Sequence, residues 1–117
     1  MWALVFLMIL LEKGTLFNFS KVLQDGNESK FIQVQLYDDV NNLIGTYPVN
    51  HVGNGIYQNR TVPANTVGVF FAKYVVYKNA SYTTVDKKYS QVLDMIRVED
   101  IVEILTETID FGDGSAS

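Results

Sequence analysis

Apolar and polar residues alternate along much of the chain, in runs of the length that β-strands have. The clearest run is 30–38, where Ile32, Val34 and Leu36 share one parity and glutamines lie between them. Alternation of this kind predicts a strand with one buried face. Turn-forming residues separate such runs at spacings of roughly 8 to 12 residues, which is typical of a small β-sandwich or barrel.

The same alternation predicts further strands, one after another. They are expected at 15–23, 30–38, 43–49, 56–62, 67–77 and 89–98, with a short extended piece at 82–85. Pro48 indicates an edge strand and Pro63 ends a strand, because proline cannot donate to a hydrogen-bond ladder. The run 67–77 is apolar on both faces, which indicates a central strand between two layers. We therefore expect a mainly β fold, an antiparallel β-sandwich, over residues 14–98.

The predicted core follows from the strand parities. It consists of apolar residues expected on the inward faces of the longer strands: Ile32, Val34, Leu36, Ile56, Val69, Phe71, Val75, Val92 and Ile96. At 117 residues and 48% hydrophobic composition, the chain has enough apolar surface for one domain with extra segments at its ends.

The N-terminal segment 1–13 is an apolar run that Glu12 and Lys13 interrupt. A helix that spans a bilayer needs about 20 apolar residues, so this run is too short. It resembles the apolar region of a signal peptide but lacks a basic start and a small-residue cleavage site. We expect an apolar arm or edge strand that packs on the domain or on a neighbouring subunit; membrane contact and a mis-assigned start are the alternatives.

The apolar period changes near the C-terminus. Steps of four, three and four residues predict a short amphipathic helix over 99–110, followed by a polar tail over 111–117. A helix this short is marginal alone, so it must pack on its own sandwich or on another chain. Both end segments are therefore predicted assembly elements, and the predicted interface consists of Trp2, Leu4, Phe6, Val98, Val102, Leu105 and Ile109.

Composition and charge exclude several classes of site. The net charge is −4 and the nine basic residues are scattered, which argues against direct contact with nucleic acid. Without cysteine there are no disulfides and no thiolate metal ligands. The single histidine, His51, is interpreted as structural, Asp38 and Asp39 as turn residues, and Asp110 and Asp113 as tail residues with the wrong spacing for a calcium loop. We expect no catalytic residue, metal or cofactor.

Tyrosine content raises a second kind of site. Aromatic rings stack on sugars, and the tyrosines Tyr57, Tyr74, Tyr77, Tyr82 and Tyr89 could cluster as a glycan platform. Aromatic residues in strands more often pack the core or pair across strands. Core packing is therefore the preferred interpretation, and glycan binding is kept as the alternative.

Residues 30 to about 98 resemble the immunoglobulin-like or transthyretin-like β-sandwich modules of bacteriophage virion proteins. The matching positions are Val34, Leu36, Tyr37, Asp38, Gly55, Tyr57, Pro63, Tyr74, Val76 and Tyr77. The resemblance implies an immunoglobulin-like antiparallel sandwich, without catalytic residues, in a capsid decoration, neck or tail protein. It implies a non-enzymatic subunit located in the virion, whose partners are other virion subunits, including copies of itself.

The alternative function is a glycan- or protein-binding module of a cell-surface protein. The resemblance does not separate these classes, because many surface modules share the fold and function depends on the site. A host-surface glycan is therefore kept among the candidate partners, while membrane contact and nucleic acid are not expected.

Overall fold

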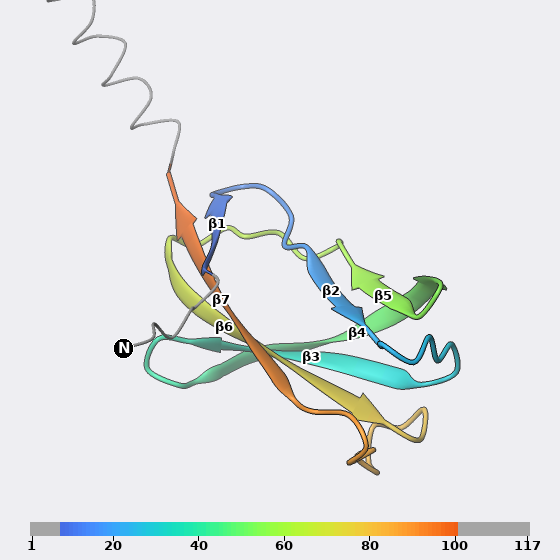
Figure 1. Cartoon of the computed structure of the whole chain (residues 1–117). Coiled ribbons are helices and arrows are strands. Elements are labelled where there is room, and N and C mark those ends of the chain that lie inside the picture. The colour runs from blue at the N-terminus through green and yellow to red at the C-terminus, as the bar shows by residue number, and fades with distance from the viewer. Residues whose placement is uncertain (1–7, 101–117) are drawn as a thin grey trace, which may run out of the picture.

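The structure is a computed structural model that describes residues 8–100 (Figure 1). Within these residues the chain forms seven strands and no helix: β1 (Met8–Glu12), β2 (Phe19–Val22), β3 (Phe31–Asp38), β4 (Leu43–Gly53), β5 (Ile56–Asn59), β6 (Gly68–Tyr77) and β7 (Val92–Glu99). They form one sheet in the order β1-β7-β6-β3-β4-β5-β2. The prediction of a mainly β fold is confirmed.

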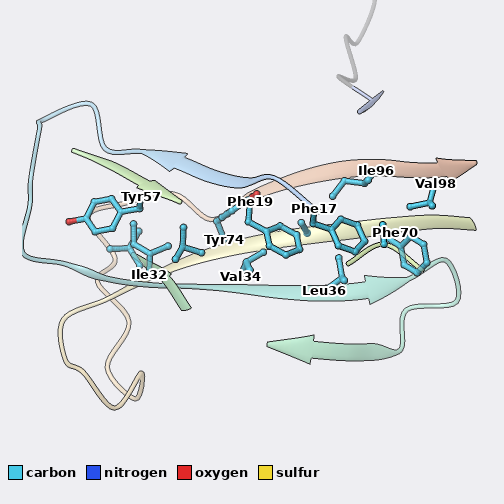
Figure 2. Packing of buried hydrophobic residues seen from close by; sticks show 14 of the residues in the cluster. Phe17, Phe19, Ile32, Val34, Leu36, Tyr57, Phe70, Tyr74, Ile96 and Val98 are labelled. Carbon is cyan, nitrogen blue, oxygen red and sulfur yellow. The ribbon is translucent and has the colours of Figure 1, made fainter. Parts of the chain in front are cut away.

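The sheet curls at β4, which changes partner along its length. Residues 43–49 of this strand pair with β3, and residues 50–53 pair with β5. Strands β5 and β2 consequently fold over one face of the part of the sheet that β3 and β6 form (Figures 1 and 2). The backbone N–H of Ser20 in β2 donates to the hydroxyl of Tyr74 in β6 at 3.2 Å, which ties the two parts together.

The core fills the concave side of the curled sheet. The ring of Phe19 lies between β2 and β3 (Figure 2), stacked on Phe17 with ring centroids 5.1 Å apart. Phe19 also stacks on Tyr47 of β4, at 5.9 Å. The buried cluster contains Phe17, Phe19, Leu23, Ile32, Val34, Leu36, Val49, Tyr57, Ala64, Phe70, Ala72, Tyr74, Val76, Ile96 and Val98. Apolar burial of this extent stabilises a domain of about 90 residues.

The predicted core is right for β3 and wrong in phase for β6. Ile32, Val34, Leu36 and Ile96 are buried in the cluster as predicted, and Val75 is buried but outside it. The inward residues of β6 are Phe70, Ala72, Tyr74 and Val76, so Val69 and Phe71 are only half-buried on the other side. Both faces of β6 are apolar, and apolar content alone therefore did not fix its phase.

Two further core predictions are wrong for local reasons. Ile56 is half-buried because the inward residue of β5 is its neighbour Tyr57, which is 1% exposed. Val92 is 38% exposed because it opens β7, where the strand has few neighbours. The error at Ile56 is a shift of one residue in phase, and the error at Val92 is one position at a strand end.

Residues 8–12 of the predicted arm form β1, the edge strand that pairs in parallel with β7. Ile9 and Leu11 of this strand pack against the core cluster. Residues 8–12 of the arm are therefore an edge strand in the sheet of the same chain. Of the predicted helix over 99–110, Glu99 ends β7, and residues 101–110 lie outside the described residues, as does the tail 111–117.

Two loops at one end of the sheet are joined by polar contacts. Asp25, between β2 and β3, accepts hydrogen bonds from the hydroxyl of Tyr89 at 2.6 Å and from the ammonium of Lys88 at 3.0 Å. Hydrogen bonds from Tyr89, Lys88 and the backbone of Asn27, in that order, lower the pKa of Asp25 to about 2. The same two loops are joined again by an ion pair of 2.8 Å between Lys30 and the buried carboxylate of Asp86.

The lowered pKa of Asp25 predicts an acid-dependent contribution to stability. A carboxyl group whose folded pKa is below its unfolded value stabilises the fold above the unfolded pKa, near 3.8, and loses this contribution as the pH falls toward 2. We expect Asp25→Asn to have a smaller loss of melting temperature between pH 4 and pH 2 than wild type, measured by circular dichroism. The control is Asp39→Asn, an exposed acid in the β3–β4 loop. Identical pH profiles for wild type and Asp25→Asn would contradict this role.

Candidate interaction surface

The convex side of the sheet carries a row of apolar side chains that face away from the core. Opposite residues in paired strands point to the same side, and the register places Tyr37, Phe71, Met95 and Met8 next to one another across β3, β6, β7 and β1. On β3, β6 and β7, the residues adjacent in sequence to this row are buried in the core: Leu36, Ala72 and Ile96. We call this side of β1, β7, β6 and β3 the outer face.

The outer face is most apolar toward its edge. Met8 is 45% exposed, Leu10 is 58% exposed and Leu93 of β7 is 58% exposed. Within the described residues, no strand pairs with the far side of β1. An edge strand with free backbone groups beside exposed apolar side chains is a ready site for contact with another chain.

A groove of about 620 Å³ opens on the outer face where β3, β6 and β7 meet. We call it the Lys73 groove, and it is lined by Tyr37, Asn41, Phe71, Lys73, Gln91, Val92 and Leu93. The hydroxyl of Tyr37 donates to the side-chain oxygen of Gln35 at 3.1 Å, which holds the ring in place. The groove therefore combines fixed aromatic surface with a few polar groups, as binding grooves do.

Lys73 is the charged group of this groove. The register places it between Gln35 on β3 and Leu93 on β7, beside the row of Phe71. Within residues 8–100, the ammonium of Lys73 has no ion-pair partner, as for most lysines of this range; among them, Lys30 and Lys88 are paired with a carboxylate. An ammonium in a groove with apolar walls would gain from a carboxylate supplied by another segment or molecule.

The predicted interface residues fall mostly beyond the described chain. Trp2, Leu4, Phe6, Val102, Leu105 and Ile109 lie outside residues 8–100. Val98 is described, and its placement is a correction: it is 0% exposed, on the inward side of β7, and belongs to the core cluster. The helical period read from Val98 begins too early, because β7 continues to Glu99.

The candidate catalytic and metal residues have structural contacts instead. The Nε2 atom of His51 accepts the backbone N–H of Gly55 at 3.3 Å, across the turn between β4 and β5. Asp38 accepts the N–H groups of Asn42 and Val40 at 2.8 and 3.1 Å, which closes the β3–β4 loop; these hydrogen bonds, that of Asn42 first, lower the pKa of Asp38. The interpretation of Asp38 as a turn residue is confirmed. In the described residues no group of three or more His, Asp or Glu could hold a metal ion.

The five tyrosines do not form one platform. Tyr57 and Tyr74 are buried in the core, and Tyr89 bonds Asp25 at the loop end of the sheet. Tyr77 and Tyr82 pack edge to face at 5.5 Å. Tyr37, which was not among the five tyrosines considered for glycan binding, is the tyrosine that lines the Lys73 groove.

One signal in the sequence marks the outer face. Lys73 has the parity of Phe71, and Arg97 has the parity of Met95, whereas the inward series of β6 and β7 contain a single charge, Asp94. Burial raises the pKa of Asp94, as expected for a partly buried carboxyl group. A lysine or arginine within an apolar strand therefore identifies the side that reaches solvent.

Comparisons with family models, curated proteins and solved structures find no match to this chain. Within residues 8–100, no helix is long and apolar enough to cross a membrane.

Proposed function

We propose that this chain is a non-enzymatic structural subunit of a large protein assembly and that its outer face is a contact surface in that assembly. The observation that carries the proposal is the exposed apolar row on β1 and β7, with Met8, Leu10 and Leu93 each 45% exposed or more. Exposed apolar side chains beside the free edge of β1 are costly in water, and contact with another subunit removes that cost.

The assembly we propose is a bacteriophage virion, in which the chain is a capsid decoration, neck or tail component. This part rests on the resemblance of residues 30 to about 98 to virion sandwich modules. The curled sheet, with β2 and β5 over β3 and β6, supports the finer proposal that the fold is an immunoglobulin-like sandwich. The partners would be other virion subunits and further copies of this chain.

A matched pair of charge substitutions tests the proposal. Leu10→Asp places a carboxylate on the outer face, and Val52→Asp, at a position 61% exposed near the β4–β5 turn, is the control. Both variants are expected to keep the wild-type circular dichroism spectrum. In a lysate of the phage that carries this gene, we expect wild type and Val52→Asp to band with the particles in a density gradient.

Leu10→Asp is expected to be depleted from the particle band at least about tenfold, because moving a carboxylate from water into an interface costs several kcal/mol, even with Arg97 opposite it on β7. The readout is quantitative mass spectrometry of the band. A wild-type chain that never bands with particles would contradict the virion assignment, and equal incorporation of both variants would contradict the role of the outer face.

A second candidate function, glycan binding at a cell surface, is favoured by the Lys73 groove. The rings of Tyr37 and Phe71 and the amides of Asn41 and Gln91 line the same groove, which is the combination that sugars bind. A monomer that binds oligosaccharides on a glycan array, and loses binding in Tyr37→Ala, would favour this function over the structural one.

A further inference from the structure

The Lys73 groove has chemistry that restricts its occupant. Its walls are apolar and aromatic because Phe71, Leu93 and Tyr37 line them. Its charged group, the ammonium of Lys73, has no ion-pair partner within residues 8–100. A matching occupant therefore carries apolar side chains together with a carboxylate. A purely apolar segment would bury the ammonium of Lys73 without an anion, which is unfavourable.

The chain itself contains one segment of this chemistry. Residues 101–117 include four acidic residues, Glu103, Glu107, Asp110 and Asp113, and no lysine or arginine. The chain has 13 acidic and nine basic residues, so residues 1–100 carry nine of each and the segment carries the whole net charge of −4. The same segment contains Ile101, Val102, Ile104, Leu105, Ile109 and Phe111, which supply the apolar part.

The other terminal segment does not fit. Residues 1–7, with the sequence MWALVFL, are apolar but contain no carboxylate side chain. They could cover the apolar walls of the groove and would leave the ammonium of Lys73 unpaired. The charge of the groove therefore selects residues 101–117.

The proposed function favours a segment from a second copy, because it makes the outer face a contact between subunits. Val92 and Leu93 line the groove at the start of β7, and the strand ends at Glu99. At about 3.3 Å per residue, β7 therefore ends roughly 20 Å from the groove. A neighbouring copy can supply the segment in a head-to-tail arrangement, which repeats into a ring or a filament.

We propose that the Lys73 groove is the docking site for residues 101–117 of a second copy of this chain, with an ion pair between Lys73 and a carboxylate of that segment. This inference rests on the proposed function, because it names the partner of the outer face. The contact is heterologous: the groove of one subunit receives the C-terminal segment of the next.

Charge reversal and restoration in the full chain test the contact. We expect Lys73→Glu to weaken self-association at least about tenfold in Kd by sedimentation velocity, as loss of a desolvated charge pair does. Lys87→Glu, an exposed lysine in the β6–β7 loop, is the control and should leave the Kd unchanged. Combining Lys73→Glu with Glu103→Lys and Glu107→Lys should bring the Kd back to within about threefold of wild type, because the reversed pair attracts again.

Coupling with a carbodiimide distinguishes a second copy from the same copy. In an equal mixture of unlabelled and ¹⁵N-labelled chains, we expect peptides that join Lys73 of one isotope to Glu103 or Glu107 of the other. Links only within one isotope would overturn docking between copies, and a charge-reversed pair that fails to restore association would overturn the choice of residues 101–117.

The inference and the proposed function can fail separately. A wild-type chain that is monomeric at all concentrations, or self-association that Lys73→Glu leaves unchanged, would overturn the inference. The proposed function is decided by the particle band and by Leu10→Asp, which lies on β1 and outside the groove.

Discussion

Replacing Phe19 by alanine is expected to lower the free energy of unfolding by about 3–5 kcal/mol, the usual cost of removing a buried phenylalanine. Phe19 is 0% exposed and stacks on Phe17 and Tyr47, so its removal leaves a cavity at the centre of the core. A loss of this size is a large part of the stability of a small domain. Urea unfolding, followed by far-UV circular dichroism, measures it.

Phe71→Ala is the matched control for Phe19→Ala. The residue type and the change are the same, but Phe71 is half-buried on the outer face. We expect its removal to cost about 1–2 kcal/mol, since less apolar area leaves contact with protein. Equal losses for the two variants would contradict the assignment of Phe19 to the core and of Phe71 to the surface.

The second large effect is expected for Gly55→Ala. Gly55 has φ +73°, a left-handed conformation that costs alanine about 1–2 kcal/mol. A Cβ atom there would also lie 2.8 Å from the Cα atom of Gly26 and 2.9 Å from the carbonyl oxygen of Leu23, both of them backbone atoms. The N–H of Leu23 donates to the carbonyl oxygen of Gly55 at 2.9 Å, so the clash falls where the β2–β3 loop meets the β4–β5 turn.

Gly26→Ala isolates the steric part of this effect. Gly26 has φ +72°, almost the value of Gly55, and a Cβ atom there would have no neighbour within 4 Å. Both variants therefore carry the same backbone cost, and the clash adds about 1–3 kcal/mol to Gly55→Ala alone. The measurement is again urea unfolding, and a Gly55→Ala variant no less stable than Gly26→Ala would contradict the close approach of the two turns.

The strands were predictable from the sequence wherever polar residues marked one face. The glutamines of β3 fixed its inward series, and Ile32, Val34 and Leu36 are buried as expected. In β6 the phase was ambiguous, because Phe70 and Phe71 are equally apolar and only Lys73 distinguishes the faces. Local sequence gives the period of such a strand, while the neighbouring strands decide which side is inside.

Local sequence patterns could not predict the pairing of β1 with β7. The two strands are more than 80 residues apart in sequence and run parallel, with Met8 opposite Met95. A parallel edge contact depends on how the whole sheet closes, so the apolar run before Glu12 indicated only an arm or edge strand. The Lys73 groove was likewise not foreseen, because its lining comes from β3, β6, β7 and two adjoining loops.

The most direct test of the central claim, that the outer face is covered in the assembly, is oxidative footprinting of the full chain as its concentration rises. Met8 and Met95 lie side by side on the outer face, and Leu93 is beside them on β7. We expect labelling of these residues to fall as larger species form, while labelling of Val52, which is 61% exposed near the β4–β5 turn, stays constant. Unchanged labelling of Met8, Met95 and Leu93 in the assembled protein would contradict the account.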